Sequence, residues 1–568
     1  MKNLKVLFKI IIYIFLLLNT FSIVLAKSSD KFDDAEDISN YFSGILSIND
    51  NRYEKSYFYL KSLNNLEDSH YTYSQYYQYS LITLSRFKDA ARYSKKLKDK
   101  KLDSFESNLI SAVYHLEDND LKKASYYLKE LQNKNQPGSI QNLLSTSLNA
   151  WINFRDVSDL DAGLNLLNAI PKRFKNIKNI QETFAYCYFD SKKTDQMFER
   201  LTSNPDINYS RYHFFHSNYL ISENNKKKAN EIITSSLNLN PKSLLLGQLK
   251  LDINKKKIFQ NKFECKKSTD VIAEILYIAS NILASQNNYM LSNFYLNLAK
   301  YLNPNFISFD AFYAENFFVI QEYEKAKKIY IQIKKKGPTY SWHASKRIAS
   351  ILNKQDKKKD AADSLKNAFV KITNPTIYEI FDYAEFLKNN EKYKESIEYY
   401  SKVLSLVDEK NDLFGKVVDG RGIAYERTDQ WGKAQVDLLA SLNASPNDAY
   451  VINYLAYSWI EKGINIKKSL KMLKKANKLK PNDGYIIDSL GWALFKLKNF
   501  KEAKKYLELA IRSMASDPVV NDHYADALWM NNKTLQARYY WNYVLKLKNT
   551  DKKLKKEIKH KLLFGLKS

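Results

Sequence analysis

Apolar residues of alternating size recur along the C-terminal third of the chain with a period of about 34 residues. Each period begins with a short run of mostly apolar or small residues, in segments 421–425, 455–459, 490–494 and 524–528. A small residue and then a large one follow later in each period: Ala434 and Leu438, Ser469 and Leu473, Ala503 and Leu507, Ala537 and Trp541. This pattern predicts two helices in each period, packed closely where the small side chain lies.

The same small position can be followed backwards through the rest of the chain. The candidates are Ser56, Ala90, Ala124, Ala162, Ala229, Ser292, Ala326, Ala361 and Ser396. Most have a large residue four positions later: Leu60, Leu128, Leu166, Ile233, Leu296, Tyr330, Leu365 and Tyr400. A weaker unit around Phe184 and Met197 fills the interval after Ala162. With only 13 Gly and 10 Pro in 568 residues, long helices joined by short turns are expected.

Large–small–large at these offsets resembles the tetratricopeptide repeat (TPR). The resemblance implies an all-α helix-pair solenoid, a right-handed superhelix of about fourteen repeats. No clear second helix follows Pro241 before about Val271, and Leu554, Ile558 and Leu562 share one face of a final helix. We therefore expect an N-terminal array (27–250), a degenerate repeat or linker (251–272), a central array (273–410), a C-terminal block (411–550) and a capping helix (551–568).

The first 26 residues differ from everything that follows them. Lys2, Lys5 and Lys9 precede an apolar run that ends in Val24-Leu25-Ala26. Such an order is typical of a secretory signal peptide and predicts export to the periplasm. The alternative is an uncleaved inner-membrane anchor, for which the interrupted run is short.

The chain carries a net charge of +27, with lysine tracts such as 226–228, 334–336 and 357–359. One interpretation is solvated turns, and the other is attraction to an anionic membrane surface or glycan. No nucleic-acid partner is expected, because no nucleic-acid module is present and the chain carries an export signal. The two cysteines, Cys187 and Cys265, lie in different repeats, and we expect each to pack as a small apolar side chain; the alternative is a disulfide between separate units.

No residues with the spacing of a catalytic, cofactor or metal site stand out. Gly420-Arg421-Gly422 lacks a third glycine and lies within a helix register. His213 and His216 have a ligand-like spacing but fall on packing positions. We therefore expect no cofactor, no metal and no enzymatic activity.

The repeat offers instead a concave surface lined by the first helix of each pair. In TPR proteins, certain positions of that helix face the groove, and here they are mostly aromatic or acidic. The residues expected to bind a partner are Asp419, Glu426, Tyr450, Tyr457, Tyr485, Asp488, Trp492, Asp522, Asp526 and Trp529. Exposed aromatic rings are effective binding anchors. We expect this groove to prefer extended segments of basic or apolar character.

Several C-terminal stretches resemble exported TPR proteins of alphaproteobacterial type. The resemblance covers roughly residues 415–547 and includes segments 421–427, 453–459, 481–484, 488–492 and 521–523, with Ala456 and Ala525 where glycine is usual. It implies a non-enzymatic scaffold for protein–protein interaction in the bacterial cell envelope, with a protein or peptide partner. The alternative is a peripheral membrane or envelope-polysaccharide binding protein that acts through its lysine-rich surface.

Overall fold

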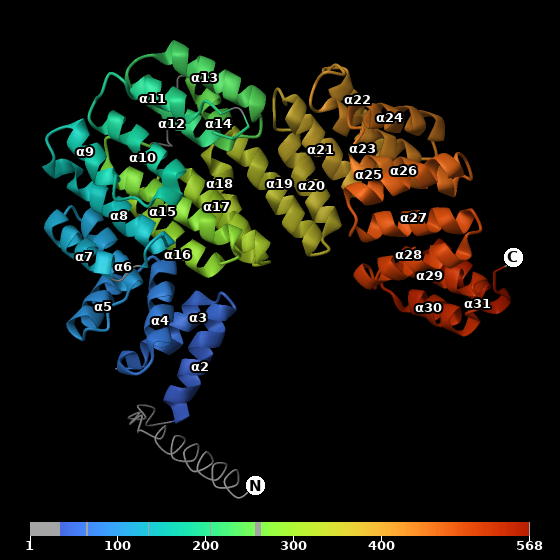
Figure 1. Ribbon diagram of the computed structural model, residues 1–568, viewed down its shortest axis with the longest axis horizontal. Coiled ribbons are helices and arrows are strands. Elements are labelled where there is room, and N and C mark those ends of the chain that lie inside the picture. The colour runs from blue at the N-terminus through green and yellow to red at the C-terminus, as the bar shows by residue number, and fades with distance from the viewer. Residues whose placement is uncertain (1–34, 64–65, 134–135, 205, 256–262, 567–568) are drawn as a thin grey trace, which may run out of the picture. The chain divides into compact units, whose positions relative to one another are not determined.

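The computed structural model describes residues 35–63, 66–133, 136–204, 206–255 and 263–566. These residues form thirty α-helices, four short 3-10 turns and no strands. The prediction of an all-α fold is confirmed (Figure 1). The expected signal peptide lies outside the described residues, as does part of the expected linker, 256–262.

Most of the helices pack against the next helix along the chain. In the first part they are α2 (Ala35–Asn49), α3 (Tyr53–Lys61), α4 (Tyr71–Thr83), α5 (Phe87–Asp99), α6 (Phe105–Glu117), α7 (Leu121–Asn133), α8 (Ile140–Asn153), α9 (Leu160–Leu167), α10 (Lys175–Tyr188), α11 (Thr194–Leu201), α12 (Ser210–Ser222), α13 (Lys226–Leu239), α14 (Leu244–Asn254), α15 (Ser268–Ser285), α16 (Tyr289–Leu302), α17 (Ile307–Val319), α18 (Tyr323–Ile333) and α19 (Pro338–Lys354). In the second part they are α20 (Lys358–Phe369), α21 (Ile377–Asn389), α22 (Tyr393–Leu404), α23 (Phe414–Glu426), α24 (Trp431–Ala444), α25 (Ala449–Glu461), α26 (Ile466–Leu479), α27 (Gly484–Lys496), α28 (Phe500–Ser513), α29 (Pro518–Met530), α30 (Thr534–Lys546) and α31 (Lys552–Phe564). With α14, α19, α20 and α31 set aside, the helices of the described residues make thirteen consecutive packed pairs.

The small positions of the repeat lie where the two helices of a pair cross. Every one of those expected from the sequence is fully buried except Ala162. There the register shifts by one residue, and Gly163 and Leu167 take the buried places expected for Ala162 and Leu166. A Cβ atom on Gly163 would lie 2.6 Å from the ring of Phe189, so only glycine fits at this crossing. The weaker unit is α10 and α11, in which Thr194 and Phe198 are the buried small and large residues.

Asparagine and aspartate shape many of the chain reversals. Asp448, Asp483 and Asp517 each accept two backbone N–H groups at the start of a helix. Asn287 and Asn532 have positive φ angles in the turns between paired helices. Short polar side chains favour both roles, because they can bond the local backbone and tolerate the left-handed region.

The chain forms two compact units, and the boundary between them along the sequence lies between Lys357 and Lys358. The expected linker 251–272 thus lies within the first unit, and residues of the expected central array 273–410 are shared between both units. Within the first unit, α15 packs against α8, and α16 packs against α4 and α6 (Figure 1). The lone helix α14 packs against α12 and α19. The first unit therefore folds its later helices back onto its earlier ones.

The expectation that the two cysteines pack separately is wrong. Cys187 of α10 and Cys265, just before α15, form a disulfide with their Cα atoms 5.9 Å apart. Folding back brings these segments together although 78 residues separate them in the sequence. Beside the disulfide, Phe263 stacks on Phe215 at 3.9 Å and lies 5.0 Å from Phe184.

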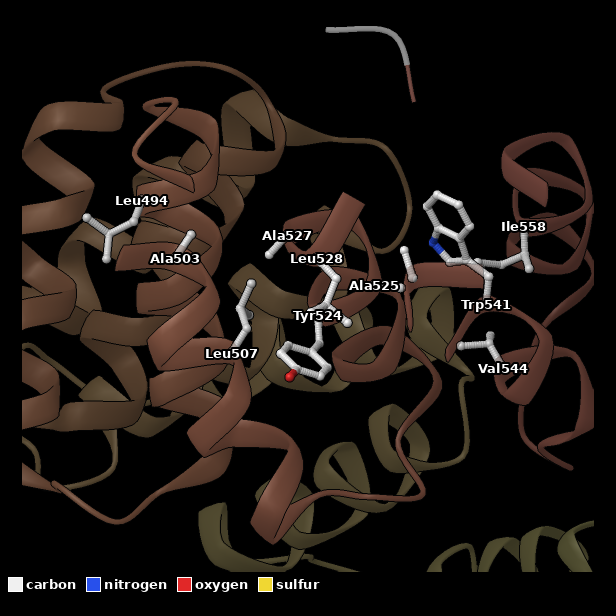
Figure 2. Close-up of a cluster of buried hydrophobic side chains, with 11 residues drawn as sticks. Leu494, Ala503, Leu507, Tyr524, Ala525, Ala527, Leu528, Trp541, Val544 and Ile558 are labelled. Carbon is white, nitrogen blue, oxygen red and sulfur yellow. The ribbon is translucent and has the colours of Figure 1, made fainter. Parts of the chain in front are cut away.

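The second unit continues pair by pair to its end. Its last core combines side chains of α27 to α31, and Figure 2 shows Ile558 of α31 beside Trp541 and Val544 of α30. The helix expected from Leu554, Ile558 and Leu562 is confirmed as α31. Ile558 is its one fully buried side chain, while Leu554 and Leu562 pack more loosely around the same core.

Candidate partner-binding groove

The ten residues expected to bind a partner lie on α23, α25, α27 and α29, the first helices of four successive pairs. They differ widely in exposure. Tyr450 and Tyr485 are 50% and 61% exposed. Four are partly buried: Asp419, Glu426, Tyr457 and Trp529. Four are buried: Asp488, Trp492, Asp522 and Asp526.

An aromatic and acidic cluster forms where α25, α27 and α29 lie next to one another. The indole of Trp492 stacks on the ring of His523 at 3.9 Å and on the ring of Phe495 at 4.7 Å. Its Nε1 donates a hydrogen bond of 2.6 Å to Glu461, and His523 forms an ion pair of 3.0 Å with Asp488. This cluster holds Trp492 in one orientation and places two carboxylates beside it.

His523 is fully enclosed by this cluster. Burial alone would lower the pKa of its imidazole, but the carboxylates of Asp488, Asp522 and Asp526 together outweigh burial. The pKa of His523 is therefore raised, and the protonated ring is favoured. The positive ring then lies against the face of Trp492, where a cation is attracted to the π system.

A second acidic cluster lies on α21 and α23, at the other end of the expected groove. Glu385 accepts hydrogen bonds from Tyr400 and from Lys388, the latter at 2.9 Å. Burial raises the pKa of Asp419 to about 6, with Lys388 opposing the rise and Glu385 adding to it.

Two tyrosines connect neighbouring pairs along the same side. Tyr454 donates a hydrogen bond of 3.1 Å to Glu426 of the preceding pair. Tyr450 donates one of 3.0 Å to Asp483 in the next turn, and Lys480 lies 4.6 Å from its ring centre. The ring of Tyr450 stays half exposed, so it can still contact another molecule.

The C-terminal helix covers the last of the expected binding residues. Lys561 of α31 bonds Asp522 at 2.6 Å and Asp526 at 2.8 Å, and these two carboxylates lie one turn apart on α29. Trp529 donates a hydrogen bond of 3.2 Å to the carbonyl of Leu566. Asp522, Asp526 and Trp529 are thus already bound by the chain itself.

Gly565 is what lets the chain end pass so close to the indole of Trp529. Its φ angle is +71°, and an added Cβ atom would lie 2.1 Å from the indole ring. Sequence reasoning missed Lys561. The signal for Lys561 was present, because it follows Ile558 by three residues and so shares the inward face of α31.

The described residues hold no group of three or more His, Cys, Asp or Glu side chains arranged to bind a metal ion. His213 bonds Ser236 at 2.9 Å, and His216 bonds Asp195 at 2.7 Å. None of the described helices is both long and apolar enough to cross a bilayer.

Comparison with known proteins agrees with the helix pairs. Residues 312–550 match a family described as tetratricopeptide repeat. A curated relative, the TPR repeat-containing protein PA4667 of Pseudomonas aeruginosa, is 24% identical over 169 residues. The match covers 30% of this chain and 28% of the relative, so it spans less than a third of that protein.

Solved structures give only distant likenesses. MamA AMB-1 is 18% identical with a TM-score of 0.26, over 30% of this chain and 99% of that one. A tetratricopeptide repeat protein from Parabacteroides merdae ATCC 43184 is 18% identical with a TM-score of 0.31, over 39% and 86%. The APC/C hetero-tetramer Cut9-Hcn1 gives 13% identity and a TM-score of 0.37, over 94% and 97%. We therefore assign the TPR-like all-α repeat fold from the helix pairs and from the family match, and not from these structures.

Proposed function

We propose that this protein is a scaffold for protein–protein interaction, and that α23, α25, α27 and α29 bind partner segments of basic or apolar character. The observation that carries the proposal is the succession of carboxylates and aromatic rings on these first helices. The family match over residues 312–550 supports a binding role, since repeat solenoids present extended concave surfaces to partners. No site in the described residues argues for catalysis instead.

The exposure and contacts of the ten residues decide which of them to replace. Trp492 and Trp529 are partly structural, because the first stacks on His523 and the second bonds Leu566. Tyr450 and Tyr485 are more exposed, so replacing them should change binding with little effect on the fold. Tyr539 on α30, a second helix, is 68% exposed and offers a matched aromatic control.

A peptide array probed with the full chain tests the proposal. We expect it to retain peptides rich in lysine, arginine and apolar residues, and to lose them with Tyr450→Ala/Tyr485→Ala but not with Tyr539→Ala. Selection of acidic peptides, or equal binding by all three proteins, would contradict the proposed groove.

We also propose that the protein is exported and works in the cell envelope. The N-terminal apolar run supports export, and so does the disulfide, since such bonds persist in oxidising compartments. Thiol labelling of cells before and after reduction tests this. The chain should resist labelling until reductant is added, and full labelling without reductant would oppose an oxidising location.

A second candidate function is binding to an anionic membrane surface or glycan. The observation that favours it is α26, a second helix whose six lysines are exposed and which has no acidic residue. Liposome sedimentation should fall with added salt and with Lys471→Glu/Lys478→Glu. Lys95→Glu/Lys129→Glu in the first unit provides the control, because both of those lysines are also exposed.

A further inference from the structure

The contact between α31 and α29 has the chemistry of ligand recognition. Only one apolar side chain of α31, Ile558, is fully buried. Lys561 inserts its ammonium between two carboxylates, with side-chain exposures of 15% for Lys561, 10% for Asp522 and 4% for Asp526. Two carbonyls near the end of α31 also accept hydrogen bonds. The carbonyl of Leu566 accepts one from Trp529, and the carbonyl of Leu562 accepts one from Arg538.

A helix kept only to cover the last core would gain most from apolar contacts. A buried ion pair contributes little net stability, because desolvation offsets most of the attraction, but it discriminates strongly against groups of the wrong charge. The Asp522 and Asp526 pair therefore selects a cation more than it strengthens the contact. Exposed Leu563 and Phe564 show that α31 leaves much of its own apolar surface unburied.

We propose that Asp522, Asp526 and Trp529 form a lysine-binding site for a basic amphipathic helix of a partner protein, and that α31 occupies it as a tethered substitute. The inference rests on the proposed scaffold function and names the chemistry of its partner. The recognised element is an aliphatic residue followed three positions later by lysine, as in Ile558 and Lys561. An acidic or uncharged helix would leave the two carboxylates buried without a cation, although Asp526 would keep its hydrogen bond from Trp541.

The tether explains how a weak contact stays closed and how it could open. A short linker gives the tethered helix an effective concentration on the order of millimolar. A partner helix must exceed this advantage, which it can do by also contacting the part of the groove that α31 leaves free. That part includes Tyr450 and Tyr485 on the neighbouring pairs, which are 50% and 61% exposed.

The test uses the full chain and a fluorescein-labelled peptide with the sequence of residues 549–566. Lys561→Met in the chain removes the cation but keeps most of the side-chain volume. We expect this variant to bind the peptide at least tenfold more tightly than the unaltered chain, as measured by fluorescence anisotropy. Lys559→Met, on the exposed side of the same helix, should behave like the unaltered chain.

Two further measurements separate recognition from general attraction between opposite charges. Adding Asp522→Asn and Asp526→Asn to the Lys561→Met chain should weaken peptide binding at least tenfold. A peptide that carries methionine at position 561 but keeps its other lysines should also bind at least tenfold more weakly. The proposal is wrong if the chain with the two asparagines binds the peptide as tightly as Lys561→Met alone. It is also wrong if the methionine peptide binds as tightly as the unaltered peptide.

The fold of the variant is checked by circular dichroism and by hydrogen exchange of α29 and α30. If Lys561→Met unfolds this last pair, α31 is a required structural part and the proposal is wrong. If the variant is folded but does not bind the peptide, the proposal is wrong as well. The proposed scaffold function has its own test in Tyr450 and Tyr485, so either idea can fail while the other stands.

Discussion

The two units differ in what lies against the first helices of their pairs. In the first unit, α15 and α16 pack against α4, α6 and α8, so the chain covers that side with its own helices. In the second unit, α31 reaches only the last pair, where Lys561 bonds Asp522 and Asp526. A solenoid side that is filled by its own chain has become a core, whereas the side of the second unit that α31 does not cover is the one that we propose for binding.

The same difference appears in how each unit buries charge. Arg211 in the first unit forms a bidentate pair with Glu274, at 2.7 and 2.5 Å, and lies 3.8 Å from the ring centre of Tyr277. That pair joins α12 to α15 across 63 residues of sequence and holds the folded-back helices in place. The buried lysine of the second unit holds only a terminal helix. The Arg211 and Glu274 pair therefore serves the architecture of the first unit, and we infer that the Lys561 contact in the second unit serves recognition.

The largest expected effect comes from breaking the buried pair of the first unit. Arg211→Met leaves Glu274 without its cation at an exposure of 1%, and should cost about 3–5 kcal/mol of unfolding free energy. Urea unfolding followed by hydrogen exchange should show the loss in the first unit alone. Arg92→Met, whose side chain is 70% exposed, should cost under about 1 kcal/mol.

The double variant Arg211→Met/Glu274→Leu tests whether the loss of stability comes from the unpaired charge of Glu274. Removing both charges avoids an unpaired buried group, so the double variant should be more stable than Arg211→Met alone. A double variant that is less stable than either single one would mean that the pair contributes mainly packing.

The disulfide should give the next largest effect. Cys187→Ser/Cys265→Ser releases a loop of 78 residues and should lower the stability of the first unit by about 2–5 kcal/mol. Reductant should lower the melting temperature of the unaltered protein in the same way and leave the double variant unchanged. An effect of similar size on the exchange of α27 and α29 would contradict the independence of the two units.

The repeat could be predicted from the sequence because it depends on residues that lie close together along the chain. Ser56, Ala434 and Ala537 are each followed by a large residue one helical turn later, and that spacing alone sets the helix crossing. The shift at Ala162 was not readable, because it depends on the ring of Phe189 more than twenty positions away. Local patterns thus predicted helices and pairs but not their exceptions.

The long-range contacts could not be predicted. Pairing of Cys187 with Cys265 requires α15 to lie back near α10, and no spacing in the sequence encodes this. The binding residues followed from their register, but whether each one is covered depends on distant segments. Asp522 and Asp526 were expected to face a partner, and the structure shows them bonded to Lys561. Whether they bind a partner remains a prediction.

Acidity should affect the histidines of the two units in opposite directions. The pKa of His523 is raised, because Asp488, Asp522 and Asp526 together outweigh burial. Its contribution to stability is therefore complete below its unfolded pKa and is lost as pH rises through the folded pKa. The pKa of His216 is lowered by burial, which outweighs Asp195, so its contribution is lost as pH falls below the unfolded value.

Stability measured between pH 5.5 and pH 8 tests this contrast. His523→Gln should flatten the decline of the second unit on the alkaline side, and His216→Gln should flatten the decline of the first unit on the acidic side. Both variants shifting the same unit, or the same side of the profile, would contradict the assignment of the two pKa directions.

The smallest expected effect concerns how firmly α31 is held. Asp551 caps this helix by accepting the backbone N–H of Leu554 at 2.8 Å. Asp551→Ala should make local opening of α31 easier by about 1 kcal/mol, as measured by hydrogen exchange, because the first turn loses its cap.

If α31 is an exchangeable occupant, this change should also increase binding of the peptide of residues 549–566 several-fold, without altering Trp492 or the first unit. If α31 is only a cover for the core, easier opening should instead expose Trp541 and Val544 and accelerate exchange of α30. The two outcomes differ in which helix responds, so even this small change distinguishes a surface that binds from a core that is closed.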